Sequence, residues 1–218
     1  MNYSEALSFA FQDEEWLKKM AIGGLLILVS FYFGLLFIFG FFILGYYVGI
    51  MRNVIHDAEK SLPDWHHWSK LFIDGIMGTV ILLIYFVIIG GLCALMIVSI
   101  CTQAYFPQVE MVMSIVSVSL MTLFLLMFFT NFGLLQFALT ENFASAFDIS
   151  ALLRIIKNGF GHFLAIIIFS LILNAILLFA GLGFFSPFTN FWGLVVQGHL
   201  FGQCAKNCLK PVVSGQTV

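Results

Sequence analysis

Long apolar runs separated by short polar segments dominate the chain. The runs cover residues 20–55, 71–100, 111–140, 159–182 and 188–205. About 20 apolar residues in a helix cross the hydrocarbon core of a membrane. The first run is too long for one such helix and just long enough for two short ones that turn between residues 30 and 40. The pattern therefore predicts an all-α fold, a polytopic transmembrane helix bundle with six spans.

The basic residues favour six spans over five, the number expected if the first run were one long helix. With six spans, all 9 Lys and Arg residues fall on one side of the membrane, and the opposite side carries only Glu110. Basic residues gather on the cytoplasmic side of membrane proteins. We therefore expect a multi-pass protein of the cell (inner or cytoplasmic) membrane with its N- and C-termini in the cytoplasm.

Composition agrees with a chain surrounded by lipid. Apolar residues make up 61% and charged residues 9% of the sequence, and its mean hydropathy is +1.06. A soluble fold with this composition would have too few polar residues to cover its surface. The net charge of −2, without a basic tract, gives no reason to expect nucleic-acid binding. Membrane lipids are the expected surroundings.

A weak internal repeat occurs on the predicted cytoplasmic side. Segments 16–23, 68–75 and 152–159 align without gaps and share a bulky apolar residue, a following base and a glycine. An acid that suits a helix N-cap stands shortly before each segment, at Asp13, Asp64 and Asp148. Each segment would be a short amphipathic interfacial helix that leads into a membrane hairpin. Coincidence is the alternative, because Trp and basic residues are common at membrane interfaces.

The repeat predicts a single membrane domain, 1–218, with units 4–60, 61–140 and 141–210. The side chains that would anchor it at the interface are Trp16, Lys18, Trp65, Trp68, Lys70 and Arg154.

Two glycine pairs have the spacing that lets helix backbones approach closely. They are Gly45 with Gly49 and Gly198 with Gly202, and a base and an asparagine follow each pair. Such small-xxx-small faces are typical of helix packing in membranes. We expect packing within the chain, with packing between protomers as the alternative.

Several segments together resemble a known family. They are residues 10–19, residues 45–53, and Leu62-Pro63-Asp64-Trp65 with Asp74-Gly75. They resemble an uncharacterised family of prokaryotic six-span membrane proteins, a domain of unknown function. That family is distantly similar to the membrane domain found beside glycerophosphodiester phosphodiesterases. The resemblance covers nearly the whole chain and implies a membrane fold without an activity. It departs at residues 30–34, where relatives often place proline.

Two histidines are candidate cofactor ligands. His199 lies in the last expected span, and His162 begins the fifth. Ionisable residues within spans are functional hypotheses by default, because each needs a partner away from lipid. Either imidazole could bind a haem or chlorophyll-type pigment, or relay protons. A histidine that merely packs in the core is the simpler alternative.

Other chemical groupings point to no site. His66 and His67 are adjacent, so their side chains point in different directions on a helix. Cys204 and Cys208 share a helical face but lack the further ligands of a zinc site. We expect no metal site and no catalytic residues.

Three classes of function remain after these expectations. The preferred one is a non-catalytic membrane subunit or scaffold that packs with other membrane proteins or with itself. The second is a small transporter, channel or lipid-handling protein, in which helices broken at Gly90-Gly91 and at residues 181–183 would accompany a polar path between spans. The third is a haem- or pigment-binding membrane subunit. An enzyme is the least expected class. The residues that could line such a path, or only hydrogen-bond between helices, are Asn131, Gln136, Asn174 and Gln197.

Overall fold

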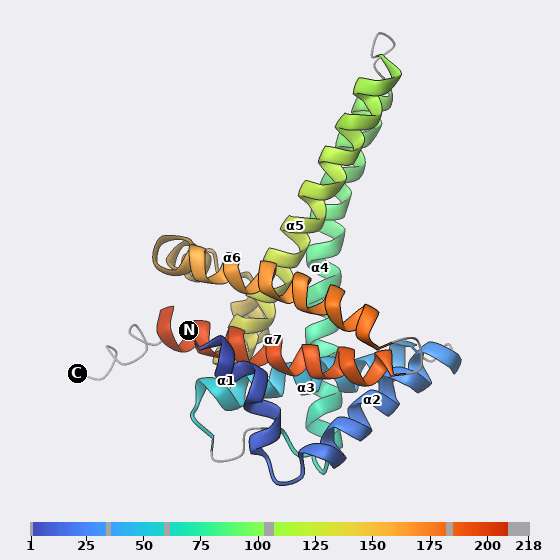
Figure 1. The fold of residues 1–218 in the computed structure, drawn as a ribbon. Helices are drawn as coiled ribbons and strands as arrows, with labels where there is room; N and C mark the ends of the chain where they lie inside the picture. Colours follow the sequence, from blue (N-terminus) through green and yellow to red (C-terminus); the bar gives the residue numbers. More distant parts are fainter. Residues whose placement is uncertain (1, 34–35, 59–61, 103–106, 182–184, 209–218) are drawn as a thin grey trace, which may run out of the picture.

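The computed structural model is helical in every regular element of the residues that it describes, 2–33, 36–58, 62–102, 107–181 and 185–208 (Figure 1). Two short helices, α1 (Tyr3–Ser8) and the 3-10 helix η1 (Phe9–Gln12), precede the long ones. The long helices are α2 (Trp16–Phe33), α3 (Leu36–Ile55), α4 (Trp68–Cys101), α5 (Gln108–Thr140), α6 (Ile149–Ala180) and α7 (Ser186–Cys208). A second 3-10 helix, η2 (Phe143–Phe147), connects α5 to α6.

The first apolar run holds two helices, as predicted, because α2 ends at Phe33 and α3 begins at Leu36. The number of spans is supported only in part. Among the described residues, four helices are long and apolar enough to cross a membrane: α3 from Ile38, α4, α5 and α6. The other two predicted spans, α2 and α7, are not among these four. Six spans, and the positions of both chain ends, therefore stay predictions.

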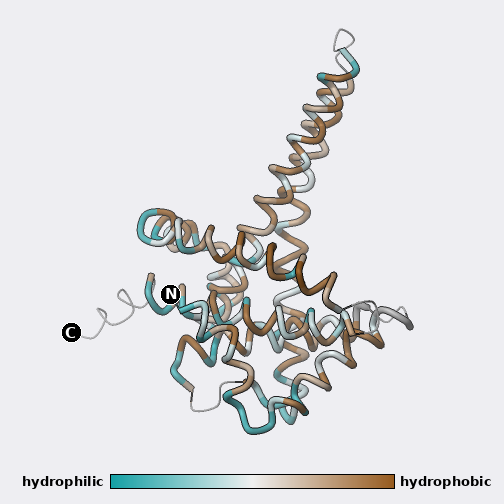
Figure 2. Tube along the Cα trace, viewed as in Figure 1, coloured by the Kyte–Doolittle hydropathy of each residue, from teal (hydrophilic) through white to brown (hydrophobic). Residues whose placement is uncertain are grey.

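The α4–α5 pair forms a long hairpin that extends well beyond the other helices (Figure 1). Helices α2, α3, α6 and α7 cross the hairpin near its base in this view. Figure 2 shows hydrophobic residues along most of the hairpin and hydrophilic residues at its tip and in the loops at its base. The fold thus combines a packed body with a projecting apolar arm.

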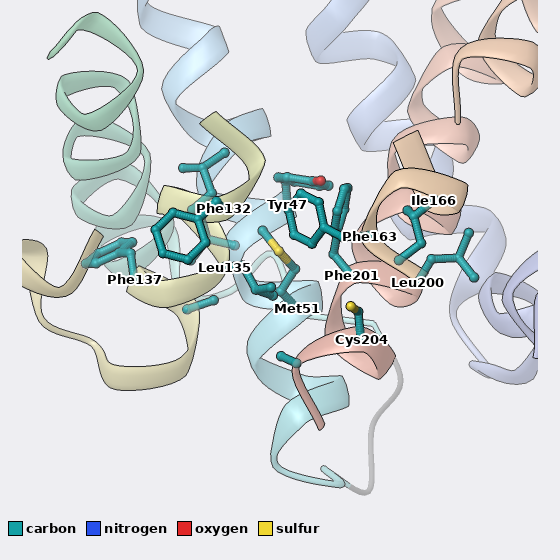
Figure 3. Packing of buried hydrophobic residues seen from close by; sticks show 14 of the residues in the cluster. Tyr47, Met51, Phe132, Leu135, Phe137, Phe163, Ile166, Leu200, Phe201 and Cys204 are labelled. Atoms are coloured by element: carbon teal, nitrogen blue, oxygen red, sulfur yellow. The ribbon is translucent and has the colours of Figure 1, made fainter. Parts of the chain in front are cut away.

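Two apolar cores meet on adjacent faces of α3. In the larger core, Tyr47 and Met51 of α3 pack with residues of α5, α6 and α7, among them Phe132, Phe163 and Phe201 (Figure 3). The smaller core takes Tyr46 and Ile50 from α3, together with residues of α2, α7 and the loop before α4. Helix α3 is therefore the central element of the body.

The α3 and α4 backbones touch where two glycines face each other. A Cβ on Gly45 would lie 1.8 Å from the Leu71 carbonyl oxygen, and a Cβ on Gly75 would lie 1.7 Å from the Phe41 carbonyl oxygen. No side chain larger than hydrogen fits at either position. This is the close approach for which small residues are used between membrane helices.

The remaining glycines of the two predicted pairs, Gly49, Gly198 and Gly202, also pack against other segments of the same chain. Gly49 lies against Pro63, and Gly198 lies against Ile50 and Tyr47 of α3. Gly202 lies against Val54 and the Met51 carbonyl. All of these neighbours belong to the same chain, so the glycines bring α3, α7 and the loop before α4 together.

The segments predicted as interfacial helices are the beginnings of long helices. Residues 16–23 start α2, residues 68–75 start α4, and residues 152–159 lie in the first turns of α6. Their aligned glycines, Gly23, Gly75 and Gly159, are all closely packed. A Cβ at these positions would lie 2.5 Å or less from Phe191, Phe41 and Cys208, respectively. Close packing gives a physical reason for these glycines, whereas the repeat itself stays a prediction. Helix α4 continues through Gly90 and Gly91 without the break that a transporter would suggest.

We predict that Gly75→Ala destabilises the fold, because the added methyl group must push α3 away from α4. Overpacking of this kind costs about 1–3 kcal/mol, which corresponds to a fall of roughly 2–12 °C in Tm for a chain of this size. Gly90→Ala is the matched control on the same helix, since its Cβ would meet nothing within 4 Å. Thermal unfolding of the purified protein in mild detergent makes the comparison. Equal Tm values for the two variants would contradict the close crossing.

Candidate functional site at the polar end

Charged and amide side chains gather where α2 and α4 begin and where α3, α5 and α7 end. We call this region, residues 2–19, 52–58, 62–74, 141 and 199–207, the polar end. Ion pairs connect its segments to one another, as the following contacts show.

Lys19 is a buried base held by two acids. Its Nζ lies 2.8 Å from Asp13 Oδ2 and 2.9 Å from Asp64 Oδ1, and it donates a hydrogen bond to the Leu62 carbonyl at 3.1 Å. The residue is only 3% exposed. A buried charge is stable only when it is paired and hydrogen-bonded. Lys19 therefore fixes the loop before α4 against the start of α2.

Trp65 lies inside the protein, and this corrects its predicted role as an interfacial anchor. The residue is 5% exposed, its ring stacks on Tyr46 with centroids 4.5 Å apart, and its Nε1 donates to the Lys19 carbonyl at 3.1 Å. A ring that completes the smaller core has little surface left to offer to lipid. Trp68 is 42% exposed and Trp16 is half-buried.

Arg52 joins α3 to α4 and α5. Its Nη1 donates to Asp74 Oδ2 at 2.6 Å, and its Nε lies 2.8 Å from Glu141 Oε1 in an ion pair that lacks hydrogen-bond geometry. Lys70 lies 3.7 Å from the same Glu141 oxygen. Arg52 thus neutralises an acid that is itself buried, Asp74.

The remaining predicted basic anchors form weak surface pairs. Lys18 contacts Glu15 at 3.3 Å, and Arg154 contacts Asp148 at 4.0 Å. Exposed pairs of this kind contribute little to stability. Of the three acids predicted as N-caps, Asp148 caps α6 by accepting a hydrogen bond from the Ser150 N–H at 2.8 Å. Asp13 Oδ1 accepts a hydrogen bond from the Glu15 N–H at 2.9 Å directly before α2, while its Oδ2 binds Lys19. Asp64 also binds Lys19.

A cavity of about 800 Å³ opens between the N-terminal segment, the end of α3 and the end of α7. Its charged lining residues are Glu5, Asp57 and Lys206, and the last two form an ion pair. Gln203 bridges two segments, because its Nε2 donates to Glu5 Oε2 at 3.4 Å and its Oε1 accepts from the Asn2 N–H at 3.0 Å. The cavity is therefore polar and joins segments that are far apart in the sequence.

His199 lies in the wall of this cavity. It is 3% exposed, its ring stacks on Phe9 with centroids 4.0 Å apart, and its Nδ1 has no hydrogen-bond partner among the described residues. His162 is exposed on α6 and does not line the cavity. The structure does not bring the two histidines together. Binding of a haem or pigment stays a prediction, which the visible absorption spectrum of the purified protein tests.

Two of the four polar residues proposed for a solute path, Asn131 and Gln197, bond between helices. Asn131 Oδ1 accepts hydrogen bonds from the Tyr47 hydroxyl at 2.9 Å and from Gln197 Nε2 at 3.4 Å, which links α5, α3 and α7. Asn174 donates to the Ser170 carbonyl within α6 at 2.8 Å. Gln136 is buried, and its Nε2 has no partner among the described residues. Helix packing accounts for the polarity of Asn131 and Gln197.

Sequence reasoning missed both Lys19 and the cavity. The sequence signal for Lys19 was present, because four acids lie in residues 10–19 and 62–65, two of the segments that carry the family resemblance. The cavity left no such signal, since its walls come from three distant segments. In the described part of the chain, no three or more His, Cys, Asp or Glu side chains gather in a way that could hold a metal ion.

We predict that Lys19→Met strongly destabilises the protein. The substitution keeps a long apolar stem but removes the ammonium group that neutralises Asp13, whose side chain is only 7% exposed. Loss of one partner of a buried ion pair costs about 3–5 kcal/mol. Lys18→Met is the control, because Lys18 is exposed and makes one surface pair. Its effect should stay within about 0.5 kcal/mol. Denaturation in detergent measures both variants, and a Lys19 variant as stable as the control would refute the buried pair.

Comparison with known proteins now gives the chain its family. No curated protein and no solved structure matches it. A family model described as "Protein of unknown function (DUF4013)" matches residues 9–185. This match supports the resemblance to an uncharacterised domain and lends no support to the more distant similarity to the phosphodiesterase membrane domain. The matched region includes both buried ion-pair clusters, the α3–α4 crossing and the whole hairpin. The chain therefore belongs to DUF4013, a family of proteins of unknown function.

Proposed function

We propose that this protein is a non-catalytic subunit or scaffold of a membrane complex, and that it packs with a membrane partner through the α4–α5 hairpin. The observation that carries the proposal is the apolar outer half of the hairpin. Figure 1 shows no other helix beside it, and Val87 and Leu95 of α4 are 69% and 68% exposed. Large exposed apolar surfaces mark contact with lipid or with another protein.

One face of α4 suits a helical partner better than lipid alone. Val87, Gly91, Leu95 and Val98 follow one another at helical spacing on the exposed surface of the helix. We call these four residues the outer face of α4. A Cβ on Gly91 would meet nothing within 4 Å, whereas Gly45 and Gly75 each receive a neighbouring backbone. A small residue that leaves room on an apolar face permits close approach of another helix.

The proposed location is the cell membrane, with the polar end on the cytoplasmic side. The support is the concentration of bases there, because Lys19, Arg52, Lys70 and Lys206 all take part in ion pairs of the polar end. Lys and Arg side chains are typically concentrated in cytoplasmic loops. The sequence also predicts outside turns near residues 35, 105 and 185, and of these three positions only residue 185 is among the described residues.

Lipid handling is the second candidate, and one observation favours it. A groove of about 610 Å³ lies between α4 and α5, lined mainly by apolar side chains such as Ile89, Leu92, Met121 and Leu125. Its lining fits an acyl chain. A scaffold and a lipid-handling protein differ in what remains bound after gentle purification.

We predict that the full chain, purified from its native membrane in mild detergent, retains a stoichiometric membrane-protein partner or a second copy. Gly91→Leu should remove this partner, because a bulky side chain then occupies the outer face of α4. Gly161→Leu is the matched control, since Gly161 is an exposed glycine of α6 whose Cβ would also meet nothing within 4 Å. Native mass spectrometry identifies and counts the bound molecules.

Two outcomes would contradict the scaffold proposal. One is a partner that remains on both variants equally. The other is a wild-type protein that purifies alone, and stoichiometric lipid on that lone protein would favour the second candidate.

A further inference from the structure

Helix α6 is too long to lie wholly within the hydrocarbon core of a membrane. Its 32 residues extend over about 48 Å, whereas the hydrocarbon core is about 30 Å thick. Tilts of up to about 40° from the bilayer normal would take up only part of this difference. Residues 163–180 contain no charged residue and no histidine, and at about 27 Å this part nearly fills the core. When α6 crosses the membrane, as its length and composition allow, its first turns, residues 149–162, therefore lie outside the core.

The first turns of α6 carry an exposed apolar strip on the side that faces away from the body. Ala151 and Ile155 are fully buried in the larger core, and they fix which side of the helix faces outwards. Ile149, Leu153 and Ile156 are 71%, 59% and 46% exposed. Residues spaced three and four apart lie on the same side of a helix, so these three side chains form one strip. We call them the apolar strip of α6.

Two bases lie beside the apolar strip, and this chain neutralises them only weakly. Arg154 Nη2 lies 4.0 Å from Asp148 Oδ2, and the buried Nε of Arg154 has no hydrogen-bond partner among the described residues. Lys157 is exposed and forms no ion pair with any described residue. In contrast, Lys19 and Arg52 each lie within 2.9 Å of two acids. The start of α6 therefore carries a net positive charge.

The position of these bases suits the surface of a membrane. Arg154 and Lys157 are three residues apart, so both side chains reach the same side of the helix. Lys157 also follows Leu153 by four residues, which puts the bases along one edge of the apolar strip. Helices that lie at a membrane surface have this pattern, because their apolar side chains enter the boundary of the acyl chains while their bases reach the lipid phosphates. An acidic protein would match the bases but would not explain an apolar strip that leads directly into the membrane-crossing part of the same helix.

We propose that the first turns of α6 lie at the membrane surface, where Arg154 and Lys157 bind the phosphate of an anionic phospholipid. The guanidinium group donates hydrogen bonds to phosphate oxygens, and the ammonium group adds a second positive charge. Gly159 of α6 packs against Cys208 at the end of α7, so the site lies on the same side of the body as the polar end. The site is separate from the outer face of α4, so it stands or fails independently of the scaffold proposal.

Native mass spectrometry of the purified full chain in mild detergent, titrated with lipid, tests the site. The probes are dioleoyl phosphatidylglycerol, which is anionic, and dioleoyl phosphatidylcholine, which is zwitterionic and has the same acyl chains. We expect the first molecule of phosphatidylglycerol to bind about tenfold or more tightly than phosphatidylcholine, since each base near an anionic lipid contributes about fivefold in affinity. Combining Arg154→Gln with Lys157→Gln should remove this preference and leave phosphatidylcholine binding unchanged, which also shows that the variant is folded.

Lys18→Gln combined with Lys70→Gln is the matched control, because both are exposed bases that already pair with acids, Glu15 and Glu141. It removes the same charge and should change the affinity for phosphatidylglycerol by less than about twofold. An oligoglutamate peptide represents an acidic protein partner. The proposal is overturned if the wild type binds the two lipids equally, if the α6 variant binds phosphatidylglycerol as tightly as the wild type, if the two double variants weaken binding equally, or if the peptide binds more tightly than phosphatidylglycerol.

Discussion

The direct contact between the α3 and α4 backbones at Gly45 and Gly75 is the constraint on which the rest of the fold depends. Side chains at these positions would lie within 1.8 Å of the opposite carbonyl oxygens. In lipid, helices gain little from the hydrophobic effect between them, so close packing and polar contacts decide how they associate. The crossing also brings Arg52, two turns after Gly45, to Asp74 beside Gly75. Packing and ion pairing therefore reinforce each other at one place.

The buried charges divide the molecule into a fixed body and a free arm. Lys19 and Arg52 are neutralised by acids of the same chain and tie α2, α3, α4 and α5 together at the polar end. A buried ion pair is strongly destabilised when one partner is lost, so these contacts favour one arrangement of the body. The described residues in the outer half of the hairpin form no such ion pairs. This contrast is the physical basis for proposing partner contact at the hairpin.

Hydropathy was sufficient to predict the helices and insufficient to predict their arrangement. It located the apolar runs and the division of residues 20–55 into two helices, because both follow from the length needed to cross a bilayer. It did not predict that the hairpin projects from the body. An apolar residue that faces lipid and one that packs against protein have the same hydropathy. Hydropathy therefore does not distinguish the hairpin from the body.

The site escaped prediction for a different reason, namely the distance between its parts along the chain. The Asn2–Gln203 contact joins residues 201 positions apart, and Lys19 reaches the Leu62 carbonyl across 43 positions. A single sequence shows that a residue is charged but does not show its partner. Trp65 illustrates the limit, since an interfacial Trp and a core Trp next to a buried ion pair look alike in sequence. Only the fold separates the two.

The central claim is that the exposed apolar surface of the α4–α5 hairpin lies in the membrane. The most direct measurement attaches spin labels to Leu95 and Val116, on the two helices of the hairpin, and to Glu14 at the polar end, in protein reconstituted into lipid bilayers. Collision rates with a water-soluble nickel chelate should be low at both hairpin positions and high at Glu14. Rates at Leu95 and Val116 as high as that at Glu14 would place the hairpin in water and contradict the account.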